Sequence, residues 1–110
     1  MNEDDLRRLR TAGSELAFGA GQMLIERGKP GTGVYVVIEG NLVVEAPEGT
    51  RELGPRAVVG ERALLSSDGT RTARVRALTD CTVVAVERAA IERLCAEDPG
   101  FAERLAQASG

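Results

Sequence analysis

Apolar residues along most of the chain come in short runs that glycine or proline interrupts about every eight to ten residues. The runs lie between Ser14 and Glu87 and include GVYVVIEG, RELGPRAVVG and CTVVAVER. Such spacing is typical of a compact all-β sandwich or barrel. The runs predict about seven or eight strands, the number that a jelly roll or β-roll contains.

Helical patterns flank this β region on both sides. The segment NEDDLRRLR places acidic residues first and basic residues last, which suits a helix dipole, and Asn2 can cap its start. Further along, apolar side chains recur at helical spacing at Ala90, Ile91, Leu94 and Cys95. Pro99 disfavours helical geometry at Asp98, so FAERLAQ is expected to form a second C-terminal helix.

The 110 residues fit one domain, and we predict a single domain over residues 1–110. The predicted fold is mainly β with flanking helices. It is an eight-stranded β-roll or jelly roll over residues 14–87, with a short N-terminal helix (1–13) and two C-terminal helices (88–107).

Charge and composition exclude several classes of function. Lys plus Arg number 14 against 17 for Asp plus Glu, so a formal charge of −3 gives no general attraction to nucleic acid or anionic lipid. No apolar run approaches the ~20 residues that span a bilayer, so we expect a cytoplasmic protein without membrane insertion. Histidine is absent, which removes the usual base or ligand of many catalytic and metal sites. We therefore predict no metal site, and the interpretation favoured below also expects no catalysis and no cofactor.

The stretch GERALL, which begins at Gly60, is a candidate anion site. Gly60 allows positive φ or a close backbone approach, and the helix formers after Glu61 predict a short helix. Backbone amides at a helix start attract an anion. The plainer interpretation is a strand-to-helix connector in which the dipole merely favours Glu61.

Arg71 is the second candidate. In a regular strand, Arg71 shares a face with Ala73 and Val75, whereas Arg74 and Arg76 take the other, solvated face. A guanidinium on the inner face is costly unless it meets an anion. That anion is either Glu61, in an internal ion pair, or a bound phosphate. The planar guanidinium can bond two oxygens of a phosphate at once.

These residues together resemble the phosphate-binding cassette of the cyclic nucleotide-binding domain family, found in bacterial cyclic AMP receptor proteins, kinase regulatory subunits and gated channels. The matching positions are Gly60, Glu61, Ala63, Leu64, Leu65, Arg71, Thr72 and Ala73. Outside the cassette (60–73), ERGKPGTGVYVVIEGNLVV and RALTDCTVVAVERAAIERL are also similar to the family. The resemblance covers roughly residues 14 to 107.

The resemblance implies a role for each matching residue. Arg71 would pair with the cyclic phosphate, with backbone amides near Ala63 and at Thr72 as further donors, and Glu61 would accept from the ribose 2′-hydroxyl. The Thr72 hydroxyl would also contact the phosphate. The apolar wall beside ribose and base would be formed by Val44, Val59 and Ala73.

The chain departs from the family pattern at several positions. Arg62 replaces the usual Leu or Ile, and its charge either assists the phosphate or faces water. Val58 and Val59 stand where an aromatic residue is frequent, and Arg56 and Ala57 replace a Gly-Asp pair. Only about two helical turns follow Pro99, so no long helix is expected to cover the base, and modest affinity is predicted.

The favoured interpretation is a sensor module that binds cyclic AMP (cAMP), or alternatively cyclic GMP (cGMP), and relays binding to the C-terminal helices, where an effector can contact it. One alternative is a degenerate, ligand-free protein-interaction module with an Arg71–Glu61 ion pair. Another is the sensor fragment of a transcription regulator, although the segment after Glu97 is too short for a helix-turn-helix. A cupin-type enzyme would lack its histidine ligands.

Overall fold

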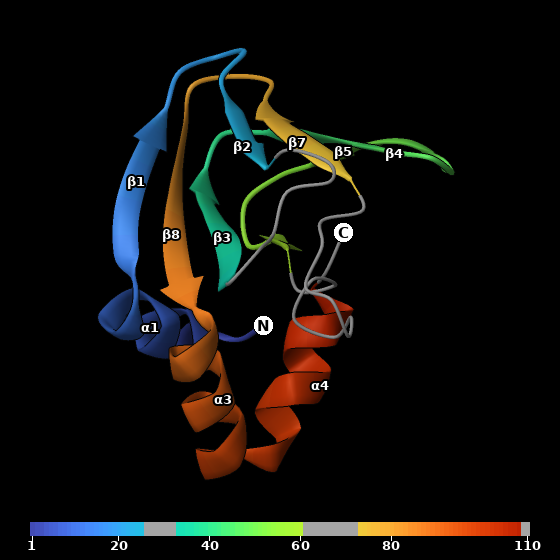
Figure 1. Cartoon of the computed structure of the whole chain (residues 1–110). Helices are drawn as coiled ribbons and strands as arrows, with labels where there is room; N and C mark the ends of the chain where they lie inside the picture. The colour runs from blue at the N-terminus through green and yellow to red at the C-terminus, as the bar shows by residue number, and fades with distance from the viewer. Residues whose placement is uncertain (26–32, 61–72, 109–110) are drawn as a thin grey trace.

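The computed structural model describes residues 1–25, 33–60 and 73–108, which form a two-sheet β-roll with helices packed beneath it (Figure 1). The first sheet has the strand order β1-β8-β3-β6 and contains β1 (Ser14–Phe18), β8 (Cys81–Glu87), β3 (Gly33–Glu39) and β6 (Val58–Val59). The second has the order β2-β7-β4-β5 and contains β2 (Met23–Ile25), β7 (Arg74–Ala77), β4 (Leu42–Ala46) and β5 (Gly49–Leu53). All of the strand pairs are antiparallel.

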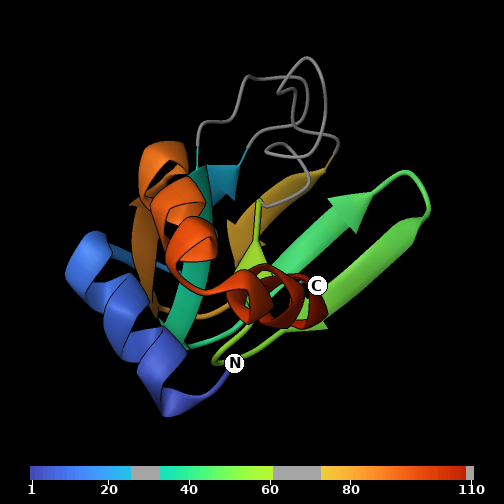
Figure 2. The ribbon, with the colours of Figure 1, turned by 90° about the horizontal axis from the view of Figure 1, so that it is seen from below.

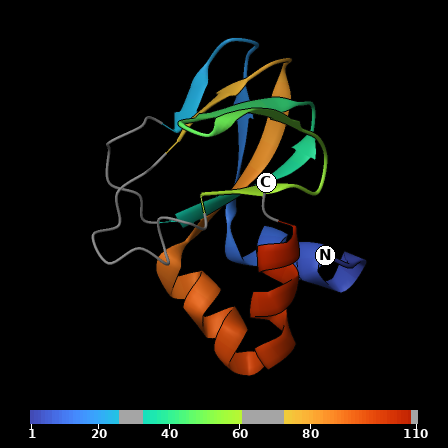
Figure 3. The ribbon, with the colours of Figure 1, turned by 90° about the vertical axis from the view of Figure 1, so that its right-hand side faces the viewer.

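The helices are α1 (Glu3–Ala12), α3 (Arg88–Glu97) and α4 (Pro99–Gln107), and they lie together below the first sheet (Figures 1 and 3). Asn2 caps α1, because its side chain accepts from the Asp5 amide at 2.9 Å and Asp5 accepts in return from the Asn2 amide at 3.3 Å. Pro99 opens α4, and the Asp98 side chain caps it by accepting from the Gly100 amide. The predicted β-roll with an N-terminal and two C-terminal helices is confirmed.

Two apolar cores occupy the two sides of the first sheet. The helix-side core, between this sheet and the helices, contains Leu9, Val34, Val36, Val58, Val84, Val86, Ala90, Ile91, Leu94, Phe101 and Leu105. The inter-sheet core, inside the roll, contains Ile25, Val37, Leu42, Val44, Val59, Val75, Ala77 and Cys81. Period-two alternation along the valine-rich strands produces this division, because successive side chains point to opposite faces.

The two residues of strand β6 belong to different apolar cores. Val58 belongs to the helix-side core and is fully buried, whereas its neighbour Val59 belongs to the inter-sheet core and is 4% exposed. The Val58 amide also donates to the Ala108 carbonyl oxygen at 3.0 Å, so β6 is bonded to the end of α4. One two-residue strand therefore contacts both the interior of the roll and the helical layer.

The run RELGPRAVVG does not form one strand but divides between the two sheets. Residues up to Leu53 lie in β5, and Val58 begins β6 in the other sheet. The turn between them contains Pro55 and Arg56, and Arg56 has a φ of 74°, the left-handed region that favours glycine. Its amide donates to the Val37 carbonyl at 2.8 Å, which holds the turn against β3.

Replacing Arg56 by glycine is expected to give a protein about 1 kcal/mol more stable than the Arg56→Ala variant. Both variants lose the surface pair that Arg56 forms with Glu3, but only glycine relieves the positive φ. Urea denaturation of the two variants measures the difference. Equal stabilities would show that the turn adapts its backbone to alanine without strain.

Candidate functional site

The candidate cassette begins and ends within the described residues, at Gly60 and Ala73. Gly60 follows β6 with a φ of 95°, so of the two possibilities predicted for this glycine, positive φ or a close backbone approach, the backbone shows the first. Ala73 lies directly before β7 and is half-buried. The short helix predicted after Glu61 and the other predicted cassette residues lie outside the described residues: Glu61, Arg62, Ala63, Leu64, Leu65, Arg71 and Thr72. Their roles stay predictions.

The residues predicted to form the apolar wall lie close together inside the roll. Val44 is 5% exposed and pairs with Val75 across β4 and β7. Val59 belongs to the same inter-sheet core, and Ala73 packs against that core from its edge. Positions distant in the sequence therefore share one apolar surface near the point where the chain leaves β6. Their contact with a ligand stays a prediction.

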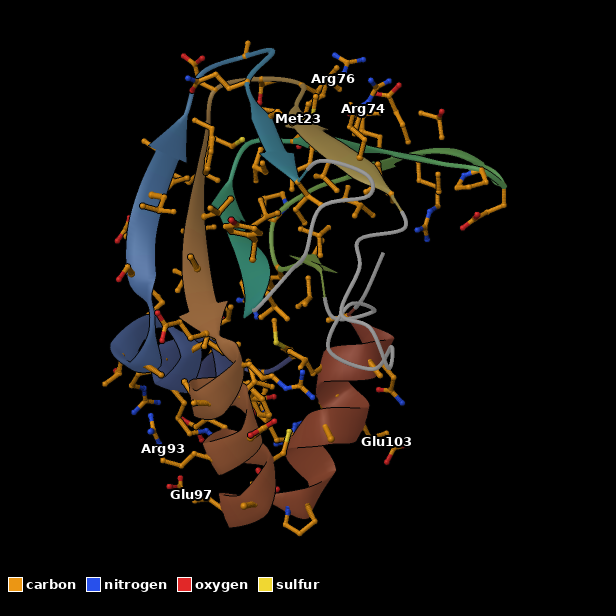
Figure 4. The ribbon with its side chains drawn as sticks, in the orientation of Figure 1. Met23, Arg74, Arg76, Arg93, Glu97 and Glu103 are labelled. Atoms are coloured by element: carbon orange, nitrogen blue, oxygen red, sulfur yellow. The ribbon has the colours of Figure 1, made fainter. Side chains whose placement is uncertain are left out.

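Arg74 and Arg76 lie on the opposite face of β7, as the strand parity predicted. Both project away from the interior of the roll (Figure 4). Each guanidinium donates to Glu45 at 3.0 Å, and these two ion pairs lower the pKa of the Glu45 carboxyl, Arg76 more than Arg74. The inner face of the same strand carries Val75 and Ala77, both buried.

A buried carboxylate in α1 is the feature that sequence reasoning missed. The Asp5 side chain is fully buried, and Arg104 donates to it from Nε at 2.8 Å and from Nη2 at 3.0 Å. Arg8 donates to Asp5 at 2.6 Å, and both arginines also bond Asp98, at 2.6 Å from Arg104 and 3.2 Å from Arg8. The Arg8 guanidinium lies 5.3 Å from the centre of the Phe101 ring.

This charge cluster of Asp5, Arg8, Asp98 and Arg104 fastens α1 to α4. Hydrogen bonds from Arg104, then the Asn2 amide and Arg8, outweigh burial and lower the pKa of Asp5 to about 2. The same arginines, Arg104 first, lower the pKa of Asp98. The predicted Asn2 cap put Asp5 in the first turn of a helix, but nothing in the sequence paired Asp5 with Arg104.

The residues that the structure describes hold no group of three or more potential metal ligands. Burial raises the pKa of both cysteine thiols, Cys81 in β8 and Cys95 in α3, so each packs as an uncharged side chain. Every helix among the described residues is too short or too polar to span a bilayer.

The fold and the described part of the site define a helix-flanked β-roll domain with an apolar core beside a glycine turn. The family model of the cyclic nucleotide-binding domain matches residues 15–98. The chain belongs to the cyclic nucleotide-binding domain family, as the cassette resemblance predicted.

Curated relatives include channels and a transcription regulator. The chain is 37% identical over 84 residues to a cyclic nucleotide-gated potassium channel of Mesorhizobium japonicum, covering 76% of this chain and 23% of the channel. It is 29% identical over 94 residues to a CRP-like cAMP-activated global transcriptional regulator of Mycobacterium tuberculosis, covering 80% of this chain and 42% of the regulator. The chain thus spans less than half the length of these relatives.

Solved structures share the fold. One, from a cyclic-GMP-dependent signalling pathway that regulates bacterial phytopathogenesis, superposes with a TM-score of 0.85 at 28% identity and covers 97% of this chain and 89% of that chain. Almost the whole described architecture, including the helices, is therefore common to both proteins.

Proposed function

We propose that this domain is a sensor that binds a 3′,5′-cyclic mononucleotide, cAMP or alternatively cGMP, without catalysis of its own. The observation that carries the proposal is the glycine turn at Gly60, placed directly after the apolar wall residue Val59 in a chain of this family. A cyclic nucleotide joins one negative charge to a ribose and to a flat base whose faces are apolar. It therefore needs both an anion site and an apolar surface beside it.

In this proposal the phosphate is bound by Arg71 and by backbone amides at Ala63 and Thr72. A guanidinium bonds two phosphate oxygens at once, and helix-start amides add donors without a further charge. Glu61 accepts from the ribose 2′-hydroxyl. The wall beside ribose and base consists of Val44, Val59 and Ala73.

Strand β6 offers a physical route from the ligand to the helices. Val59 lies on the ligand side, Val58 packs in the helix-side core, and the Val58 amide bonds Ala108 at the end of α4. A ligand that binds more tightly to one position of β6 therefore also favours one position of α4. The equilibrium between the two positions shifts by as much as the ligand's affinities for them differ.

An effector that contacts the C-terminal helices would meet their charged outer surface. Arg93 and Glu97 on α3 and Glu103 on α4 are exposed and project away from the roll (Figure 4). This surface carries both signs of charge and no large exposed apolar side chain. We propose a protein or domain as the partner and expect no shift of DNA in a mobility-shift assay at physiological salt.

Amide chemical shifts recorded with and without cAMP test the proposal. We expect saturable changes centred on residues 60–73, with smaller changes at Val58 and Ala108, because β6 joins the two regions. Noncyclic AMP, which carries a different phosphate, serves as the control and is expected to produce weak changes. A spectrum that stays unchanged at millimolar cAMP and cGMP would favour the ligand-free interaction module.

A further inference from the structure

Tyr35 lies on the inner face of β3, in the row of residues that contains Val59. The register pairs Tyr35 with Val59 of β6 on one side and with Ala85 of β8 on the other. Its neighbours Val34 and Val36 face the helix-side core, so the alternation of the strand directs Tyr35 toward the inter-sheet core, against which it packs. Tyr35 and Val59 are thus adjacent side chains on one face.

This position puts the ring next to the candidate site. Neighbouring strands lie about 4.8 Å apart, and Val59 immediately precedes the Gly60 turn. On the facing sheet, Val44 and Val75 are paired and point into the same core. Seen along the helices, β3 and β6 lie side by side in the roll (Figure 2). Tyr35 is therefore the aromatic residue nearest in register to the predicted wall.

Tyr35 differs from its aliphatic neighbours in two ways that suit a ligand. It remains half-buried, whereas Val59, Val44 and Val75 are each at most 5% exposed. Its hydroxyl makes no hydrogen bond to any residue that the structure describes. A partly exposed tyrosine ring offers a larger contact area than a valine side chain to the base or the ribose of a ligand.

The other aromatic residues do not share this position. Phe18 packs against the inter-sheet core at the opposite end of β8, where it pairs with Cys81. Phe101 is fully buried in the helix-side core. Phe18 consequently provides a matched control, because it belongs to the same core but lies away from the Gly60 turn.

We propose that Tyr35 is an affinity determinant of the nucleotide site, its ring contacting the nucleoside part of the ligand. This inference rests on the proposed cyclic nucleotide binding. Every purine presents a π-face, so contact with an aromatic ring adds affinity without distinguishing adenine from guanine. The contact therefore raises the affinities for cAMP and cGMP by similar factors.

The intrinsic fluorescence of the protein reports directly on Tyr35, because the chain contains one tyrosine and no tryptophan. Intrinsic tyrosine emission is followed during titration with cAMP and with cGMP, and a parallel titration of free N-acetyltyrosinamide corrects for absorption by the nucleotide. We expect a saturable change in emission whose midpoint equals the dissociation constant from calorimetry. This measurement uses the unmodified protein and does not depend on a variant that folds.

Substitutions separate the ring from the hydroxyl. Tyr35→Leu is expected to raise the dissociation constants of both nucleotides about tenfold or more, as loss of one aromatic stacking contact does. Tyr35→Phe keeps the ring and should bind within about threefold of the parent. The control Phe18→Leu should lower thermal stability and leave the dissociation constants unchanged.

The outcomes distinguish this inference from the function on which it rests. Calorimetric saturation without a change in tyrosine emission, or equal affinity of Tyr35→Leu and the parent, overturns the role of Tyr35 and leaves nucleotide binding intact. Absence of calorimetric binding by the parent protein overturns both.

Discussion

Replacing Arg71 by alanine is expected to weaken binding of cAMP by at least about a hundredfold, because it removes the guanidinium proposed to bond two phosphate oxygens. Truncating one member of a desolvated, hydrogen-bonded charge pair costs about 2–5 kcal/mol, and the remaining backbone amides carry no full charge. Isothermal titration calorimetry of the parent and the variant measures the loss. Thermal melts of both without nucleotide measure any accompanying change in stability.

Arg74 supplies the matched control for this prediction. It is close to Arg71 in sequence, but it lies on the outer face of β7 and bonds Glu45. Arg74→Ala should bind cAMP as the parent does and lose at most about 1 kcal/mol of stability. If Arg71→Ala instead lowers only the melting temperature, Arg71 serves an internal ion pair with Glu61, and the ligand-free module is the better description.

Asp5→Asn is expected to lower the free energy of unfolding by about 3–5 kcal/mol, the largest stability effect we predict. The change removes the charge of a fully buried side chain and leaves Asp98 as the one carboxylate of the cluster that Arg8 and Arg104 share. Part of the helix cap survives, because asparagine can still accept a hydrogen bond. Urea denaturation followed by circular dichroism measures the loss.

The neighbouring residue Asp4 is the control, because its carboxylate lies at the surface. Its side chain is 74% exposed and, among the residues that the structure describes, pairs only with Arg7, which is also exposed. Asp4→Asn should cost at most about 1 kcal/mol. Similar losses for both variants would mean that the charge cluster adds nothing beyond an ordinary surface pair.

The pH dependence of stability gives a second readout for Asp5. Its pKa is lowered in the folded protein from 3.8 to about 2, so its contribution is complete above about pH 4. As the pH falls from about 4 toward 2, the unfolded chain takes up a proton that the folded protein resists, and stability is lost. Asp5→Asn should flatten this part of the curve, whereas Asp4→Asn should not.

Much of the fold could be predicted because it depends on local patterns. Alternation of valines along a strand requires only that one face meet a core, and Asn2, Asp98 and Pro99 mark helix ends through contacts a few residues away. The division of Arg74 and Val75 between opposite faces of β7 followed from the same parity. Positive φ was one of the two roles predicted for Gly60, and its φ of 95° agrees.

The contacts that could not be predicted join distant parts of the chain. Asp5 and Arg104 are 99 positions apart, and no periodicity or motif indicates which of the many charged residues will meet. The chain passes from β5 in one sheet to β6 in the other through a turn in which Arg56 adopts a left-handed backbone conformation. Glycine adopts this conformation more readily than arginine, so the sequence did not indicate it. The importance of Val58 likewise appears only once Ala108 is placed beside it.

The pairing of Asp5 with Arg104 sets an order of events during synthesis. Helix α1 emerges from the ribosome first, but the guanidinium that its carboxylate requires follows 99 residues later. At elongation rates of roughly 5–20 residues per second, that interval lasts roughly 5–20 s. Until it ends, Asp5 has from the charge cluster only Arg8 of its own helix as a partner, so the cluster that fastens α1 to α4 is completed only after α4 has been translated.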